Sequence, residues 1–84
     1  MTSDQIQKFV EAEDRKDKRL RISFKTRNTI TGIFVFAQDY KDMKAKNFWR
    51  IVPFASLEKW ETSKDPSLSR IYSGSEFTKI ADDK

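Results

Sequence analysis

A run from Thr29 to Tyr40, TITGIFVFAQDY, is apolar on both sides when it is read as an extended strand. Its alternate residues fall into two apolar sets, Ile30, Phe34 and Phe36 on one face and Ile33, Val35 and Ala37 on the other. A chain of 84 residues can bury only a small core, so this strand needs a helix or a folded-over segment on its outer side. Gly32 lies inside the run, where the strand can bend sharply or a second backbone can come close. We therefore expect a bent central strand and place the corner of a small barrel at Gly32.

The segment before this run has the pattern of a half-buried strand. Leu20, Ile22 and Phe24 alternate with polar residues, which is the period of an extended chain with one face in a core. Asn28 suits the tight polar turn that must follow. These residues predict a first strand that leads by a short turn into the bent one.

Two segments after the central run are expected to complete the sheet. Residues 47–52, NFWRIV, predict a third strand, which Pro53 interrupts or places at an edge. Residues 76–82, EFTKIAD, predict the last strand. Residues 54–63 are open to two interpretations, because an apolar spacing of three fits a turn of helix, but we favour a strand that is entered through a turn.

Helical signals occur near the beginning of the chain and again before the last strand. Residues 1–14 predict a helix that Thr2, Ser3 or Asp4 can cap, with an apolar stripe at Ile6, Phe9 and Val10. Residues 65–74, DPSLSRIYSG, predict a short helix with Asp65 as its cap, Pro66 in its first turn and Gly74 at its end. Residues 38–46 are expected to be a loop.

These elements predict one domain, residues 1–84, of the mainly β (α+β) class. An N-terminal helix, residues 1–14, precedes a five-stranded, strongly bent antiparallel small barrel at residues 19–81, with a short helix before the last strand. Barrels of this size are of the SH3-like or Sm-like kind. The fold is expected to be a platform for binding.

Two stretches resemble the motifs of the Sm, LSm and Hfq families. Residues 20–40 resemble the first motif, with an alternating strand, a polar turn, a glycine in a bent second strand and then an aspartate beside an aromatic residue. Residues 71–80 resemble the second motif, with Phe77 and Ile80 three and six residues after Gly74. The resemblance implies a small barrel that binds RNA and assembles with further copies through strand edges near Trp60 or Phe77. Other families of small SH3-like barrels share the glycine in the bent strand.

The composition argues against an enzyme. The chain has no histidine and no cysteine, and its remaining acids and bases have no spacing that marks an activated nucleophile. The usual zinc ligands are absent, no glycine-rich phosphate cradle occurs, and we expect neither a metal nor a cofactor. The N-terminal residues have no apolar run of the signal-peptide kind, and no segment could span a bilayer. We expect a cytoplasmic protein with no membrane partner.

The net charge of +4 is distributed unevenly along the chain. Residues 14–50 contain eleven Lys and Arg against four Asp and Glu, whereas both flanking segments are slightly acidic. A segregated positive field attracts polyanions, because cations hold phosphates and aromatic rings stack on bases. We therefore expect a site for single-stranded nucleic acid, with RNA favoured, made of Arg19, Arg21, Lys25, Arg27, Tyr40, Lys44, Lys46 and Arg50. Mixed surface charges also keep a small protein soluble, and solubility is the simpler explanation for any single charged residue.

The aromatic residues divide into one candidate for binding and three for packing. Tyr40 lies in a polar segment and can either present its ring to a base or cover an end of the barrel. Phe48, Trp49 and Trp60 are expected to pack in the core of so small a domain.

A module for protein interaction or assembly is the alternative function. Exposed strand edges or an aromatic groove would then hold a peptide or a second copy of the chain. A continuous positive face with accessible rings would favour nucleic acid. Dispersed cations with a groove elsewhere would favour a protein partner.

Overall fold

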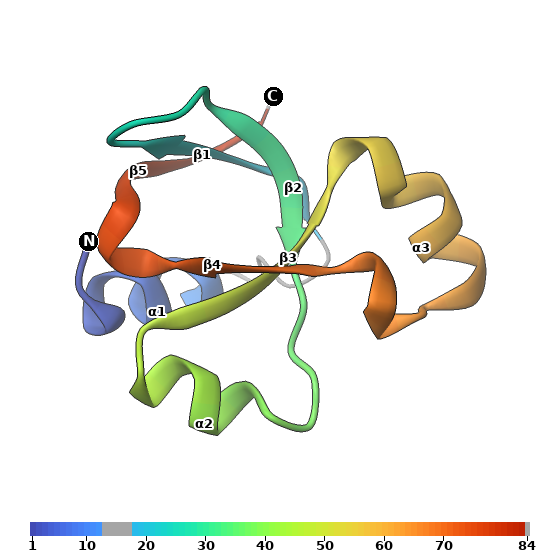
Figure 1. Ribbon diagram of the computed structural model, residues 1–84, viewed down its shortest axis with the longest axis horizontal. Coiled ribbons are helices and arrows are strands. Elements are labelled where there is room, and N and C mark those ends of the chain that lie inside the picture. Colours follow the sequence, from blue (N-terminus) through green and yellow to red (C-terminus); the bar gives the residue numbers. More distant parts are fainter. Residues whose placement is uncertain (13–17, 84) are drawn as a thin grey trace.

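The computed structural model describes residues 1–12 and 18–83. In this part of the chain five strands form one antiparallel sheet, together with three α-helices (Figure 1). The strands are β1 (Leu20–Phe24), β2 (Ile30–Phe34), β3 (Phe48–Pro53), β4 (Arg70–Ser73) and β5 (Phe77–Asp82). The helices are α1 (Ser3–Glu11), α2 (Tyr40–Ala45) and α3 (Leu57–Ser63). The strand order is β4-β3-β2-β1-β5, so β4 and β5 lie at the two edges of the sheet.

Helix α1 begins as its sequence predicts. The Thr2 hydroxyl accepts a hydrogen bond from the backbone N–H of Gln5, and the Gln5 side chain accepts one from the N–H of Thr2, which is a capping box. Ile6 and Val10 are buried and Phe9 packs beside them, so the apolar stripe faces the sheet. The helix ends at Glu11, and the rest of the predicted helix, residues 12–14, falls mainly outside the described residues.

Strand β2 is covered on both faces, which confirms the interpretation of its sequence. Its inner face contributes to a cluster, here called the inner cluster, that consists of Ile6, Val10, Leu20, Ile22, Phe34, Trp49, Ile51, Phe77 and Ile80. Its outer face contributes to a second cluster, here called the outer cluster, that consists of Ile33, Val35, Val52, Leu57 and Trp60. Helices α1 and α3 lie on opposite sides of β2 (Figure 1). Each helix therefore covers one face of the same strand.

Gly32 serves the close approach of a neighbouring strand. It pairs with Pro53 in β3, and a Cβ atom at this position would lie 2.5 Å from the carbonyl oxygen of Val52 and 2.8 Å from Cγ2 of Ile51. Both distances are too short for any larger residue unless the strand moves. This was one of the two roles expected for the glycine.

The predicted closed barrel is wrong, because β4 and β5 do not pair and the bent sheet stays open. One 3-10 turn, Gly74–Glu76, carries the chain from one edge of the sheet to the other. Helix α1 lies at the opening, where the N-terminal ammonium group of Met1 donates hydrogen bonds to the carbonyls of Gly74 (3.1 Å) and Phe77 (2.7 Å). Ile6 and Val10 of the helix pack in the inner cluster with Phe77 of β5.

Three local predictions need correction: the strand favoured over a helix at residues 54–63, the extent of the helix at residues 65–74 and the loop at residues 38–46. Residues 54–63 form a 3-10 turn, Phe54–Ser56, followed by α3, because Leu57 and Trp60 share the helix face that packs on the outer cluster. The helix predicted for residues 65–74 is limited to the 3-10 turn Pro66–Leu68, and the chain then extends as β4 beside β3. The loop predicted at residues 38–46 contains α2.

Candidate functional site

Several of the eight residues predicted to bind nucleic acid contact other side chains of the chain. Arg19, Arg21, Lys25 and Arg27 precede β1, lie on it or follow it, and all four are exposed. The guanidinium of Arg19 lies 5.9 Å from the ring centre of Phe54, and Arg21 forms an ion pair with Asp83 at 3.0 Å. The cations of this segment therefore point to different neighbours.

Tyr40 is held by packing and does not present its ring. It stacks on Phe36 with ring centres 4.3 Å apart, and its hydroxyl donates a hydrogen bond of 2.6 Å to Oε2 of Glu11. The same Glu11 oxygen lies 3.6 Å from Nζ of Lys44. Burial, together with the hydrogen bond to Glu11, raises the pKa of Tyr40 well above its usual range. Tyr40 and Lys44 thus attach α2 to α1.

Arg50 is engaged by a carboxylate. Its Nε and Nη2 atoms donate to both oxygens of Asp39 at 2.7–3.2 Å, a two-pronged pair that also holds the pKa of Asp39 below its usual value. Lys46 is exposed at the end of α2. Four of the predicted residues, Arg21, Tyr40, Lys44 and Arg50, are therefore bonded to acidic side chains of this chain.

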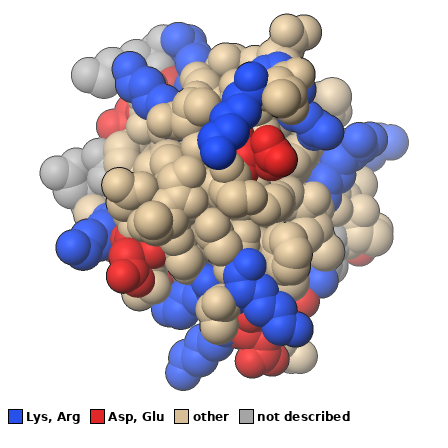
Figure 2. Space-filling view, turned by 60° about the vertical axis from the view of Figure 1, so that its left-hand side comes forward, with Lys and Arg blue, Asp and Glu red and all other residues tan. Residues whose placement is uncertain are grey.

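The surface charge is mixed on the side of the molecule that carries the Gly74–Glu76 turn. Figure 2 shows Lys and Arg mainly around the margin, with Asp and Glu among them and a broad uncharged centre. A polyanion that follows a face needs a continuous positive track. On this side of the molecule the described Lys and Arg side chains do not form such a track.

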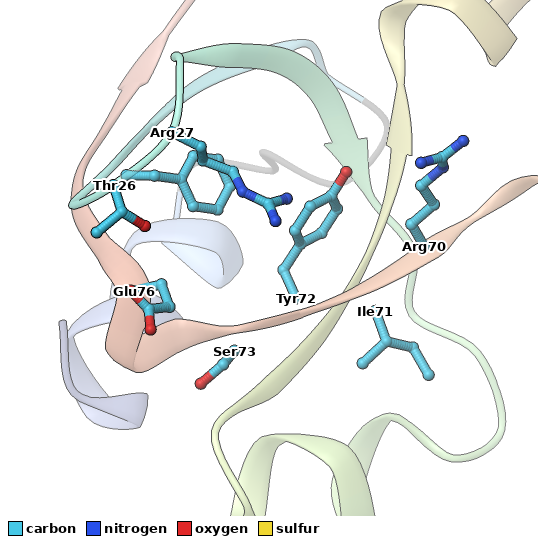
Figure 3. A pocket seen from close by; sticks show the side chains of 8 residues that line it. Thr26, Arg27, Arg70, Ile71, Tyr72, Ser73 and Glu76 are labelled. Atoms are coloured by element: carbon cyan, nitrogen blue, oxygen red, sulfur yellow. The ribbon is translucent and has the colours of Figure 1, made fainter.

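A cleft lies along β4 where the open sheet leaves its edge exposed. It has a volume of about 350 Å³, and all four residues of β4 line it. The remaining lining residues come from β1, the turn after β1 and the turn before β5: Phe24, Thr26, Arg27 and Glu76 (Figure 3). We call this space the β4 cleft.

The aromatic wall of the β4 cleft consists of two tilted rings and a cation that lies near both. The ring centres of Phe24 and Tyr72 are 5.5 Å apart. The guanidinium carbon of Arg27 lies 5.5 Å from the Phe24 ring centre and 5.7 Å from that of Tyr72. Figure 3 shows Arg27 on one side of the Tyr72 ring and Arg70 on the other, while Ile71 points away from them. The cleft therefore offers two cations, an aromatic surface and the backbone of an edge strand.

Of the residues that line the β4 cleft, the sequence predicted only Arg27 as part of a site. The sequence predicts Phe24 on the buried face of a strand, and it predicts a short helix for the segment that contains Arg70 and Tyr72. The alternation of Arg70, Ile71, Tyr72 and Ser73 is a strand pattern that could have indicated this edge. Asp65 and Pro66 favour a helix instead, but the turn that they begin ends at Leu68.

Within residues 1–12 and 18–83, no group of three or more Asp and Glu side chains is placed to hold a metal ion. In the same residues no helix has the length and the apolar character that a membrane span requires. Comparisons of the chain with protein-family models, curated proteins and solved structures found no match.

Proposed function

We propose that the protein is a non-enzymatic interaction module that binds an extended peptide by adding it as a strand to the free edge of β4. The observation that carries this proposal is that an edge strand lines a cleft along its whole length. An edge strand presents unpaired N–H and C=O groups, and peptides that add to such an edge gain affinity from backbone hydrogen bonds. The module acts by holding a partner, without chemistry.

The geometry of β4 suits this mode of binding. Residues Arg70 to Ser73 pair with Ile51 to Phe48 of β3, and no strand within the described residues pairs with the other edge of β4. Ile71 is 53% exposed on one face of the strand, and Tyr72 lies against Phe24 on the other. An added strand would contact an apolar side chain on each of its faces.

The charges in the cleft favour an acidic peptide. Arg27 and Arg70 both line it, against one carboxylate, Glu76. Arginine recognises carboxylates through two parallel hydrogen bonds, which gives direction as well as attraction. The expected ligand is an extended segment that alternates acidic and apolar residues.

A fluorescence anisotropy titration tests the proposal. The probe is a capped, fluorescein-labelled peptide of alternating Glu and Val, at low and at moderate salt. We expect saturable binding that a version N-methylated at alternate amides reduces about tenfold or more, because it cannot complete the ladder of backbone hydrogen bonds. Arg70→Glu should weaken binding, whereas Lys59→Glu makes the same charge change at an exposed position of α3 that does not line the cleft, and should leave binding nearly unchanged. Equal binding of the methylated and unmethylated peptides would overturn strand addition.

Single-stranded nucleic acid is the second candidate, and the placement of the Tyr72 ring between two arginines favours it. A base could stack on an aromatic ring while the cations hold its phosphates. The titration is repeated with ten-nucleotide oligo-U and oligo-dT. Each phosphate contact on a single strand contributes about −0.7 to the slope of the logarithm of the binding constant against the logarithm of the salt concentration. Two contacts should therefore give a slope of about −1.4. Arg27→Glu should then flatten the slope.

A second copy of the chain is the third partner to test, as the resemblance to the Sm families implies. Light scattering after size exclusion measures the mass of the assembly in solution. A mass that rises with concentration, and that Arg70→Glu returns to the monomer, would mean that the β4 edge pairs with another copy. A constant monomer mass leaves the edge available for a peptide.

A further inference from the structure

A second hollow lies on the outer side of the sheet, at α3. It has a volume of about 650 Å³, within the range of small-molecule sites. Its apolar lining consists of Ile33, Phe54, Ala55, Leu57 and Trp60. Phe54 is 59% exposed, whereas phenylalanine side chains are usually buried in the core of a domain. This hollow is independent of the β4 cleft, with which it shares no lining residue.

Trp60 in this lining has an unsatisfied donor. Its side chain is 7% exposed, and its indole Nε1 is buried with no hydrogen-bond partner. Trp49 has the opposite situation, because its Nε1 donates a hydrogen bond of 2.8 Å to Oδ1 of Asn47. A buried N–H without an acceptor destabilises the folded state, so a ligand that supplies an acceptor gains that hydrogen bond.

The charges around the hollow balance. Arg19 and Lys64 contribute two positive charges, and Glu58 and Glu61 two negative charges. Each cation lies over one of the rings, Arg19 at 5.9 Å from the centre of Phe54 and Lys64 at 5.4 Å from that of Trp60. A balanced rim gives no net attraction to an ion of either sign. The rings, the apolar floor and the unpaired Trp60 N–H then decide the ligand.

We propose that the hollow at α3 binds a small, uncharged aromatic molecule that carries one hydrogen-bond acceptor, such as a carbonyl oxygen. The ring of the ligand packs on Leu57 and Ile33 beside Phe54. The indole N–H is buried, so binding requires the Trp60 side chain to turn until this donor reaches the acceptor. The ligand thereby satisfies the donor that the protein alone leaves unpaired.

Proton–nitrogen NMR of the ¹⁵N-labelled protein tests this proposal, because the chain has two tryptophans and therefore two indole N–H signals. The probe is acetophenone, which has a ring and a carbonyl but no donor. We expect it to shift the Trp60 signal progressively and to leave the Trp49 signal in place. Ethylbenzene, which lacks only the acceptor, should bind about fivefold more weakly, the factor expected for one hydrogen bond. Benzoate, which adds a charge, should bind no better than ethylbenzene.

The variant Trp60→Phe separates the hydrogen bond from the packing. It keeps a ring and removes the N–H, so acetophenone and ethylbenzene should bind it equally, as followed by the methyl signals of Ile33 and Leu57. Phe54→Ala changes an exposed residue, should fold, and should weaken both probes. The proposal is overturned if acetophenone leaves Trp60 unmoved up to its solubility limit, if ethylbenzene or benzoate binds as tightly as acetophenone, or if Trp60→Phe keeps the preference.

Discussion

The two faces of β2 show how one strand can serve two different purposes. The inner cluster combines α1 with residues from β1, β2, β3 and β5, and it includes Trp49, whose indole nitrogen is hydrogen bonded. The outer cluster has five buried residues, two of them from the short helix α3, and it includes Trp60, whose indole nitrogen has no hydrogen-bond partner. The inner face is complete without a ligand, whereas the outer face leaves a hollow. Stability should therefore depend chiefly on the inner face and small-molecule binding on the outer one.

Burial of the individual side chains supports the same contrast. The residues of the inner cluster are at most 2% exposed, except Ile80 at 6%, whereas those of the outer cluster range from 0% at Val52 to 9% at Val35. Shortening a side chain that has no solvent contact lowers the free energy of unfolding the most, because the surroundings cannot relax to fill the cavity.

The largest expected effect is that of Phe34→Ala on the inner face. Phe34 is 2% exposed and makes edge-on ring contacts with Trp49 and Phe77. Removing the ring should lower the free energy of unfolding by about 3–5 kcal/mol, enough to unfold much of the population of so small a domain. Urea denaturation followed by tryptophan fluorescence measures this. Phe54→Ala is the control, and a Phe34→Ala midpoint equal to that of the control would refute the inner cluster as the main core.

Leu57→Ala tests the outer face in the same way. We expect a loss of about 2–3 kcal/mol, toward the lower end for a buried leucine, because Leu57 lines a hollow that solvent already reaches. Glu58→Ala, one residue away on the exposed side of α3, should change stability little. If Leu57→Ala destabilises the protein as much as Phe34→Ala, the contrast between the two faces is lost.

Gly32→Ala should cost about 1–3 kcal/mol, because the new methyl group would meet the Val52 carbonyl oxygen and force β2 away from β3. The same denaturation experiment gives the value. Amide hydrogen exchange should also speed up in both strands, since the shift weakens their shared hydrogen bonds. Unchanged stability would mean that the two strands have room to separate freely.

The smallest effect concerns the Tyr40 hydroxyl, which packs beside the inner cluster. Its pKa is raised above the ordinary value of 10.0 by burial and by Glu11, so the protonated phenol favours the folded state. That stability is fully present below pH 10 and is lost as the pH rises through the folded-state pKa. Tyr40→Phe should therefore lose less stability than the parent above pH 10, as thermal melts at several pH values would show. Parallel pH profiles would contradict the contribution of this residue.

The strands with clear apolar periodicity could be predicted from sequence. Leu20, Ile22 and Phe24 alternate cleanly, and the two-faced pattern of β2 correctly required a cover on its outer side. The nature of that cover was missed, because Leu57 and Trp60 are the only buried residues of α3 and two residues do not establish a period. The open sheet was missed because strand patterns specify faces and turns, but not whether two edges meet.

The candidate site was predicted less well, because charge along a sequence does not specify charge on a surface. Arg50 and Asp39 are eleven residues apart, and neither the pair nor the Tyr40–Glu11 hydrogen bond has a signature in the chain. The β4 cleft joins Arg27 to Tyr72 across the open sheet, a contact that depends on the bend of the strands. Only Arg27 belonged to the predicted set.

The pairing of β1 with β5 has a consequence for the order of folding. Leu20 pairs with Asp82 and Ile22 with Ile80, so β1 takes its second neighbour from a segment about sixty residues later in the chain. Contacts of such high sequence separation form late and slow the approach to the native state. During synthesis β1, β2 and β3 could assemble early, but Leu20 and Ile22 would stay partly open to water until residues 77–82 had left the ribosome. The nascent chain would then expose an apolar sheet edge, the surface that chaperones bind and that aggregation begins from.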